Sequence, residues 1–201
     1  MAARSNRDSQ MIDVIIAAKD EADTIGPIVD AFRSLPEVSN VIVSVNGSSD
    51  DTYQTSIDHG AYVVWSEVAN KGLAVHRALS HVTTDRVVLC DADLIGFTAE
   101  HAQLLSQPYA GEILGILDAP VGGEVGRRAR GLPAITGERA LPTNVLRQVP
   151  LYGYAMEMQL NAAVRLRNLP VMVVSLDGVT TVVRAGPFRA IDIANDMRYM
   201  N

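Results

Sequence analysis

Residues 12–32 read IDVIIAAKDEADTIGPIVDAF and combine two patterns in succession. The apolar run Ile12–Ala18 predicts a buried strand. Apolar residues from Ile25 to Phe32 then recur at positions i, i+3, i+4 and i+7, which predicts an amphipathic helix that ends near Pro36. A strand followed directly by a helix is the repeating unit of parallel α/β sheets, so this stretch favours that fold class.

The same alternation continues as far as residue 90. The predicted elements are, in order, a strand at Val41–Val45, a helix at Asp51–His59, a strand at Ala61–Ser66, a helix at Gly72–Val82 and a strand at Arg86–Cys90. Connections of this length join parallel strands by right-handed crossovers, and uninterrupted apolar runs suit strands that are buried on both faces. The sequence therefore predicts an α/β fold, a Rossmann-like three-layer sandwich with a mostly parallel central sheet.

The second half of the chain is less regular. Its predicted elements are a helix at Ala99–Ser106, a strand at Glu112–Leu117, an exposed and mobile loop at Asp118–Gly131, a strand-like Ala134–Ile135, helices around Thr143–Gln148 and at Tyr154–Asn168, and a strand at Val171–Leu176. The loop carries Arg127, Arg128 and Arg130, which either close over a bound ligand or are solvated. Residues 1–10 are polar and without period, so we expect a disordered tail before a single domain at 11–201.

Composition limits the class of protein. The chain has 201 residues, 48% hydrophobic and 20% charged, which suits a globular domain and excludes a disordered, collagen-like or coiled-coil chain. A single Cys excludes an internal disulfide and a thiolate zinc site, and it indicates a reducing compartment. No apolar run approaches the roughly 20 residues of a membrane-spanning helix, so we expect a soluble, cytoplasmic protein. The net charge of −6 argues against a general nucleic-acid binder.

Polar residues follow three of the predicted strands at their carboxyl ends. These clusters are residues 17–21 (AAKDE), 46–52 (NGSSDDT) and 91–93 (DAD). Ligands bind at this edge of an open parallel sheet, at the point where the strand order reverses. Asp, Asn, Ser and Gly are also ordinary capping and turn residues, so each cluster alone is consistent with a structural turn. Their coincidence at one edge favours a ligand site.

The pair Asp91 and Asp93 is the most informative of these clusters. Two carboxylates at the end of a buried strand need a compensating cation. Mg²⁺ or Mn²⁺ binds one or two carboxylates together with phosphate oxygens, which suits a diphosphate ligand. The alternative is a strand-to-helix turn with two solvated carboxylates. We expect core packing, and no chemistry, for four other residues: Cys90, Trp65, Met156 and Met158.

These segments resemble the family 2 glycosyltransferases, whose nucleotide-sugar-binding α/β fold is called GT-A. The similar segments are residues 14–29 (VIIAAKDEADTIGPIV), 41–52 (VIVSVNGSSDDT), 69–79 (ANKGLAVHRAL) and 87–94 (VVLCDADL), the last of which resembles the DXD strand of the family. Residues 131–146 and 151–179 resemble, more loosely, the acceptor half of small members such as polyprenyl-phosphate mannosyltransferases and glucosyl-3-phosphoglycerate synthases. The resemblance implies a nucleotide-sugar-binding half at 11–118 and an acceptor-binding half at 119–201.

Matched residue by residue, the resemblance implies roles for individual side chains in binding the donor. It implies that Ala17, Ala18 and Glu21 contact the nucleoside, that Asn46 reads the base, and that Lys71 lies near the base or the phosphate. Asp91, Ala92 and Asp93 match the DXD segment, in which Asp93 would be the direct ligand of Mn²⁺ or Mg²⁺ and Asp91 its companion.

The remaining matches concern the sugar and the acceptor. Gly137, Glu138 and Arg139 match a loop beside both, and the Arg139 guanidinium suits a phosphate, which makes it a catalytic candidate together with Asp93. Glu157 matches an acidic residue on the following helix. It would take the acceptor proton in an inverting reaction or position the substrate in a retaining one, and the sequence leaves both outcomes open.

Three departures from the family pattern stand out. Asn46 replaces the commoner Asp, which changes the charge at the base, and Lys19 stands where Asn is usual. Some relatives complete the metal shell with a His in the second half, whereas this chain has no His beyond residue 101 and carries Thr180 and Thr181 there. We therefore expect a weak metal site that depends on the substrate.

The expected function is metal-dependent transfer of a hexose from a UDP- or GDP-sugar to a hydroxyl or phosphate acceptor. A small phosphorylated molecule, a polyprenyl phosphate, a protein and a modified nucleic acid all stay open as acceptors, and so does a homodimer that completes the acceptor site. A nucleotidyltransferase and an inactive nucleotide-sugar-binding module are the alternatives. The loop AAKDEA disfavours the first, because it lacks a Gly-rich, Arg-containing phosphate cradle.

Overall fold

The computed structural model describes residues 11–117, 136–151 and 156–182. Its central sheet has seven strands in the order β3-β2-β1-β4-β7-β6-β8, and β7 runs antiparallel to both its neighbours while the other pairs are parallel. The strands are β1 (Ile12–Ala18), β2 (Val38–Asn46), β3 (Tyr62–Ser66), β4 (Arg86–Asp91), β6 (Glu112–Leu117), β7 (Arg139–Pro142) and β8 (Val171–Leu176). The predicted α/β class with a mostly parallel sheet is confirmed.

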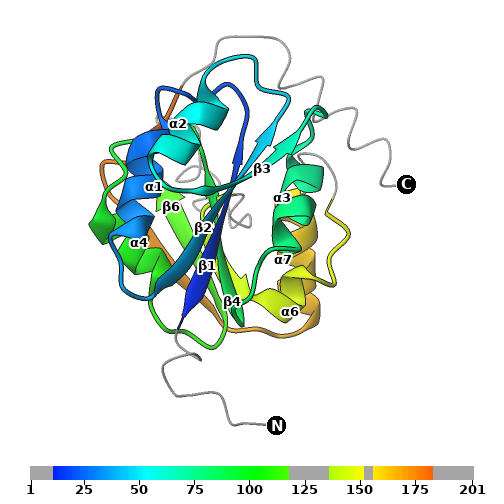
Figure 1. The fold of residues 1–201 in the computed structure, drawn as a ribbon. Helices are drawn as coiled ribbons and strands as arrows, with labels where there is room; N and C mark the ends of the chain where they lie inside the picture. Colours follow the sequence, from blue (N-terminus) through cyan, green and yellow to red (C-terminus); the bar gives the residue numbers. More distant parts are fainter. Residues whose placement is uncertain (1–10, 118–135, 152–155, 183–201) are drawn as a thin grey trace, which may run out of the picture.

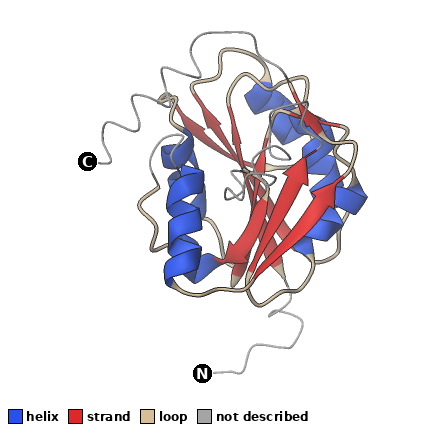
Figure 2. Cartoon of the chain, turned by 180° about the vertical axis from the view of Figure 1, so that it is seen from behind, coloured by secondary structure: helices blue, strands red, loops and turns tan. Residues whose placement is uncertain are grey.

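Helices cover both faces of the sheet and give the molecule three layers (Figures 1 and 2). One face carries α1 (Ile25–Arg33), α2 (Thr52–Asp58) and α4 (Ala99–Ser106), and the other carries α3 (Lys71–Leu79), α6 (Thr143–Leu146) and α7 (Met156–Leu166). None of the helices in the described ranges is long and apolar enough to cross a membrane.

The sheet is buried because its strands contribute to two apolar cores at once. In β1, Val14 and Ile16 pack into the cluster beneath α1 and α4, whereas Ile15 faces the cluster beneath α3 and α7. Side chains of a strand alternate between the two faces of the sheet, so a strand covered on both sides is apolar at most positions, and in β1 only the buried Asp13 departs from this. This explains why the run Ile12–Ala18 lacks the polar alternation of a half-exposed strand.

The strand order reverses between β1 and β4. Residue Ala17 of β1 lies opposite Ser44 of β2 on one side and opposite Asp91 of β4 on the other, in parallel register. The carboxyl ends of β1, β2 and β4 therefore meet at one edge of the sheet, at the topological switch point where such folds bind ligands. Each of the three polar clusters in the sequence lies at this edge.

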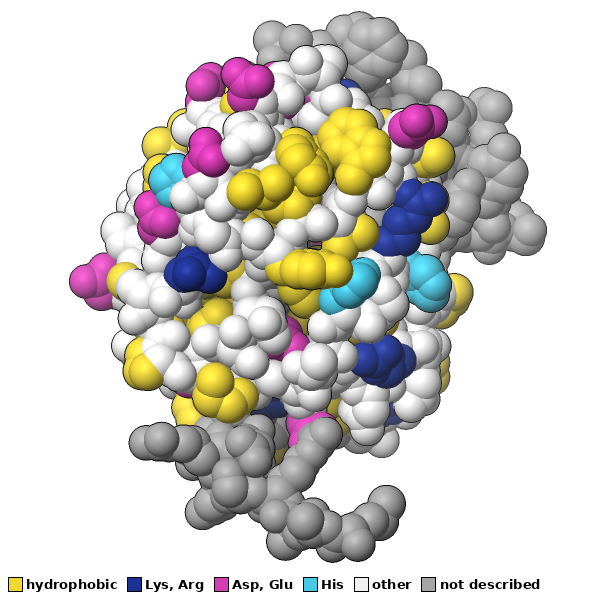
Figure 3. All heavy atoms as spheres, in the orientation of Figure 1, with side chains coloured by type: hydrophobic (Ala, Val, Ile, Leu, Met, Phe, Trp, Pro, Cys, Tyr) yellow, Lys and Arg dark blue, Asp and Glu magenta, His cyan; other side chains and the backbone are white. Residues whose placement is uncertain are grey.

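The structure corrects the expectation of core packing for two residues. Trp65 is 48% exposed, because β3 is the edge strand of the sheet, and its ring lies against Tyr53 with a centroid distance of 5.9 Å. Apolar side chains gather on this surface of the molecule (Figure 3). Met158 is 45% exposed on the outer side of α7, whereas Met156 and Cys90 are buried as expected.

Some predicted segments lie outside the described residues. They are the tail 1–10, the loop Asp118–Gly131 with Arg127, Arg128 and Arg130, the strand-like Ala134–Ile135 and the end of the chain from residue 183. A second, small sheet pairs β5 (Leu94–Ile95) with β9 (Thr180–Thr181) in antiparallel register. It brings the end of the described chain beside the segment that follows Asp91.

Candidate active site

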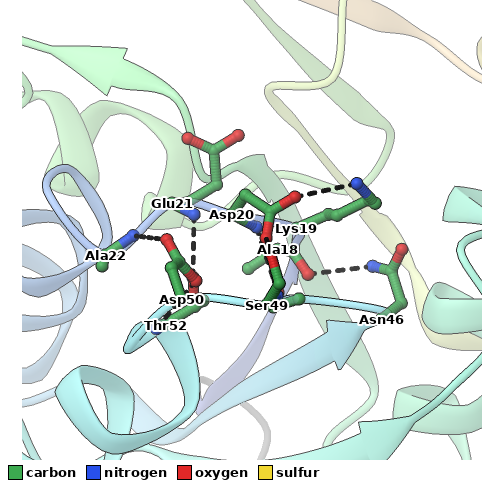
Figure 4. Close-up of polar contacts among 10 residues, drawn as sticks. Ala18, Lys19, Asp20, Glu21, Ala22, Asn46, Ser49, Asp50 and Thr52 are labelled. Atoms are coloured by element: carbon green, nitrogen blue, oxygen red, sulfur yellow. Dashed lines mark hydrogen bonds and ion pairs between the residues drawn. The ribbon is translucent and has the colours of Figure 1, made fainter.

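Asn46 is the last residue of β2, and the backbone of the neighbouring strand orients its side chain (Figure 4). Its side-chain nitrogen Nδ2 donates hydrogen bonds to the carbonyl oxygens of Ala18 (3.1 Å) and Ser44 (3.4 Å). Both partners are acceptors, so the amide group has its NH₂ toward β1 and its oxygen Oδ1 on the other side. The residue that replaces the family's usual Asp therefore still presents an acceptor oxygen at the switch point.

The loops that follow β1 and β2 are hydrogen-bonded to each other (Figure 4). Asp20 has a φ of +55°, and its carboxylate accepts a hydrogen bond from the backbone N–H of Ser49 at 2.7 Å. The backbone N–H of Glu21 donates to the Thr52 hydroxyl at 2.8 Å. Lys19, which departs from the family pattern, forms an ion pair with Asp20 at 2.8 Å, and this contact together with Ser49 lowers the pKa of Asp20. The expected nucleoside loop is thus held in one conformation.

Lys71 forms an ion pair with two carboxylates that lie far apart in the sequence. Its ammonium nitrogen Nζ lies 2.6 Å from Asp91 Oδ1 at the end of β4 and 2.7 Å from Glu157 Oε1 in the first turn of α7. Burial alone lowers the pKa of Lys71, but the negative charges of Asp91 and Glu157 outweigh burial and raise it. Lys71 is therefore charged at every physiological pH.

Gly137 lies directly against Asp91. A Cβ atom at this position would come closer to all three atoms of the Asp91 carboxyl group than a real Cβ approaches any heavy atom. The absence of a side chain is what allows the segment before β7 to reach the end of β4. This contact brings Gly137 into the same site as Asp91 and Lys71.

Substitution of Gly137 by Ala is expected to displace the Asp91 carboxylate and weaken binding of Mn²⁺ with UDP by about tenfold, since a misplaced charged ligand loses a net interaction of about 1–3 kcal/mol. Isothermal titration calorimetry measures the effect. The control is to make the same substitution in an Asp91→Ala protein, which has room for the new methyl group. In that protein, Gly137→Ala should change the affinity little. Equal losses in both backgrounds would contradict the steric explanation.

Glu138 is 1% exposed and lies next to Gly137. Its Oε2 accepts a hydrogen bond from the Thr136 hydroxyl at 2.5 Å, while Oε1 is buried and has no hydrogen-bond partner among the described residues. Burial, and then the charge of Asp91, raise the pKa of Glu138 from 4.5 to about 7. The residue therefore lies near Asp91, and its carboxyl group carries a proton over part of the physiological range.

This pKa predicts a pH dependence of stability. Because the pKa of Glu138 is higher in the folded chain, its contribution is fully present below pH 4.5 and is lost as the pH rises through about 7. Between these values the wild type should lose on the order of 3 kcal/mol of unfolding free energy relative to Glu138→Gln. Urea denaturation of both proteins across this range measures the difference. A constant difference between the two proteins would contradict the prediction.

Arg139 does not face the site, and the expectation that it binds a phosphate is corrected. Its side chain is fully buried beneath α7, where Nη1 lies 2.9 Å from Glu112 Oε1. The remaining guanidinium nitrogens donate to the backbone oxygen of Thr136 and to Asn161. All of these contacts lie inside the protein, so Arg139 supports the fold and not the diphosphate.

Asp93 lies just beyond β4 and is 8% exposed. Its backbone oxygen accepts a hydrogen bond from Val182 N–H at 2.9 Å, and the next residue, Leu94, is paired with Thr181. Thr180 and Thr181 therefore do lie beside the DXD segment, where some relatives have a His ligand. Within the described ranges there is no group of three or more His, Cys, Asp or Glu side chains placed to hold a metal ion.

Two relevant residues were not predicted from the sequence. The first is Glu112, which forms the ion pair with Arg139 and is the first residue of the apolar strand β6. A single carboxylate in an otherwise apolar strand could have indicated a buried ion pair. The second is Asp20, whose hydrogen bond with Ser49 joins the two loops, and which in the sequence looks like an ordinary turn residue. Ala17, Ala18, Glu21 and Ala92 lie at the predicted edge, but their contacts with a nucleotide stay a prediction.

Comparison with known proteins agrees with the arrangement of this edge. The model of the family described as glycosyl transferase family 2 matches residues 13–130, which is more than half of the chain. The glucosyl-3-phosphoglycerate synthase of Mycolicibacterium paratuberculosis is 39% identical over 94 residues, which cover 42% of this chain and 29% of that protein. Glycosyltransferase AglJ of Haloferax volcanii is 32% identical over 81 residues, covering 40% of this chain and 26% of that protein. These matches span less than a third of either relative.

Solved structures match over more of the chain. Glucosyl-3-phosphoglycerate synthase from Mycobacterium tuberculosis, in complex with Mn²⁺, UDP-glucose and phosphoglyceric acid, has a TM-score of 0.74 at 27% identity and covers 90% of this chain and 74% of that chain. The same enzyme in complex with Mg²⁺ and UDP has a TM-score of 0.72 at 26% identity, with the same coverage. The family model covers more than half of the chain and the solved structures match its fold, so the chain belongs to glycosyl transferase family 2, with the GT-A fold.

Proposed function

We propose that this chain transfers glucose from UDP-glucose to a small phosphorylated hydroxy acid such as 3-phosphoglycerate, with the help of Mn²⁺ or Mg²⁺. The observation that carries the proposal is the ion pair of Lys71 with Asp91 and Glu157, since it joins a carboxylate of the donor half to one of the acceptor half. The M. tuberculosis enzyme, in structures with UDP-glucose and phosphoglyceric acid, supports the choice of substrates.

The residues at the switch point fit a divalent cation that arrives with its substrate. Asp91 and Asp93 supply two carboxylates at the end of β4, which is the number that Mg²⁺ or Mn²⁺ takes when phosphate oxygens complete its shell. When bound there, the cation would neutralise charge on the departing diphosphate. Asp93 is the proposed direct ligand, and Asp91 is the proposed second carboxylate, already paired with Lys71.

The reaction proposed breaks the bond between the anomeric carbon and the diphosphate and forms one to the acceptor oxygen, whose proton is lost. Glu157 is 6% exposed and its Oε1 is paired with Lys71, so this contact holds its carboxyl group beside the end of the sheet. We place it against the sugar and the acceptor, where it either takes this proton or orients a hydroxyl group. Either role requires the orientation that Lys71 imposes.

The orientation of Asn46 predicts which base the chain selects. Its Oδ1 can accept a hydrogen bond from N3–H of uracil, whereas N3 of cytosine has no hydrogen and would leave this oxygen unpaired in the complex. An unpaired group of this kind costs about 1–3 kcal/mol, so UDP should bind at least about tenfold more tightly than CDP. Calorimetric titration with both nucleotides in the presence of Mn²⁺ gives the ratio. Equal affinities would remove Asn46 from the base site.

The proposed activity is tested by measuring UDP released from UDP-glucose with Mn²⁺, in the presence and absence of 3-phosphoglycerate. We expect release that depends on the acceptor and appearance of the glucosylated acid in mass spectra. Glycerate without its phosphate is the matched control, and it should react poorly. Formation of UDP-glucose and pyrophosphate from UTP and glucose 1-phosphate, with no acceptor-dependent release of UDP, would indicate a nucleotidyltransferase. UDP binding without turnover on an acceptor panel would indicate a binding module.

A further inference from the structure

The position of Lys71 is unfavourable for a lysine and calls for an explanation. It is the first residue of α3, where the helix dipole is positive and a cation is disfavoured, and it is largely buried with a side-chain exposure of 18%. The helix has its own cap, because the Asn70 side chain accepts a hydrogen bond from the Leu73 N–H at 2.9 Å. Lys71 is therefore not needed to start the helix.

The two carboxylates around Lys71 have different surroundings. Asp91 lies against Gly137, so it has no room to move away in that direction. Glu157 comes from α7 on the same face of the sheet as α3, and among the described residues its hydrogen bond to Lys71 uses Oε1 only. The ammonium thus joins Glu157 to a carboxylate that lies against Gly137, and among the described residues Glu157 Oε2 is left for a further partner.

The contacts of the ammonium also limit what else it can bind. An ammonium group has three N–H donors, and two of them point at Asp91 and Glu157. The third N–H can reach one phosphate oxygen, but to bind a diphosphate with more than one N–H, Lys71 would have to break a contact of 2.6 or 2.7 Å with a carboxylate, and such charge-assisted contacts are strong. The geometry favours a role exerted through its neighbours.

We propose that Lys71 is a positioning residue for Glu157. It holds Glu157 by Oε1 so that Oε2 is presented to the sugar or the acceptor, and it does not act mainly by binding the diphosphate. This role rests on the transferase function proposed above. It differs from the role that the sequence resemblance implies for Lys71, which places this lysine near the base or the phosphate.

A double-mutant cycle tests the proposal with Lys71→Met, Glu157→Gln and the double variant, using UDP-glucose, Mn²⁺ and 3-phosphoglycerate. Lys71→Met should lower kcat about 100-fold, the size expected for a misplaced reacting group, while the Kd for UDP with Mn²⁺ changes less than about threefold. The double variant should be no slower than Glu157→Gln alone, because removing the glutamate removes what the lysine positions. Lys71→Arg should restore part of kcat.

The same measurements separate the ways in which the proposal can fail. A wild-type chain that releases no UDP with any acceptor overturns the proposed function and this role with it. An active wild type in which Lys71→Met weakens UDP binding tenfold or more with kcat retained makes Lys71 a diphosphate ligand and overturns the role alone. Losses that simply add in the double variant also overturn it. Circular dichroism and thermal melts confirm that the variants are folded.

Discussion

Replacement of Asp93 by asparagine is expected to lower the Mn²⁺-dependent rate of glucose transfer by about 1,000-fold. The amide keeps the shape of the side chain but removes the charge that would hold the cation, and a metal ion at a developing phosphate charge supplies several kcal/mol. Initial rates across a range of Mn²⁺ concentrations give both the rate and the apparent metal affinity. The structure predicts that both decline.

The control for this substitution is Asp58→Asn, a change of the same size on α2 away from the switch point. It should leave the rate and the metal dependence unchanged. Because Asp93 is nearly buried, thermal melting of the Asp93→Asn variant is needed to show that the fold is retained. Wild-type activity in a folded Asp93→Asn protein would refute the metal site at the end of β4.

Arg139→Met is expected to destabilise the fold by about 3–5 kcal/mol, the usual cost of removing one partner of a buried ion pair. The substitution leaves the Glu112 carboxylate, which is 1% exposed, without its positively charged partner. Burial raises the pKa of Glu112 even with the arginine beside it. Urea denaturation measures the loss. The double variant Arg139→Met with Glu112→Leu removes both charges and should recover most of the stability.

The two possible roles of Arg139 give opposite results in this experiment. A residue that supports the fold lowers stability and leaves the affinity of the remaining folded protein for UDP and Mn²⁺ unchanged. If Arg139 were a phosphate ligand, the variant would have normal stability and would bind UDP and Mn²⁺ weakly. The second pattern would contradict the buried contacts of Arg139 with Glu112 and Thr136.

Much of the first half of the fold could be predicted from the sequence because its signals are local. The run Ile12–Ala18 and the helical spacing after Ile25 depend only on burial of neighbouring elements, and the structure confirms both. The convergence of residues near Asp91 followed from one general rule about parallel sheets. Lys71 and Glu157 could be assigned to the same site only through the family resemblance, since 86 positions separate them.

Two of the errors, those at Trp65 and Arg139, have a common physical cause, which is that strand pairing is not encoded locally. Trp65 lies in a correctly predicted strand, but whether that strand is central or at the edge depends on which neighbours it pairs with. Arg139 was judged from its match to a loop of the family, and its direction is set by antiparallel pairing of β7 with β4, which places it opposite Leu89. Neither pairing can be read from the residues around these two positions.

The most direct test of the whole account is titration of the wild-type chain with UDP in the presence of Mn²⁺, repeated with Asp93→Asn. We predict one binding site per chain, at least about tenfold weaker binding without Mn²⁺, and loss of this metal dependence in the variant. Binding of UDP that is indifferent to Mn²⁺ and to Asp93, or no binding at all, would contradict a metal–nucleotide site at the carboxyl ends of β1, β2 and β4.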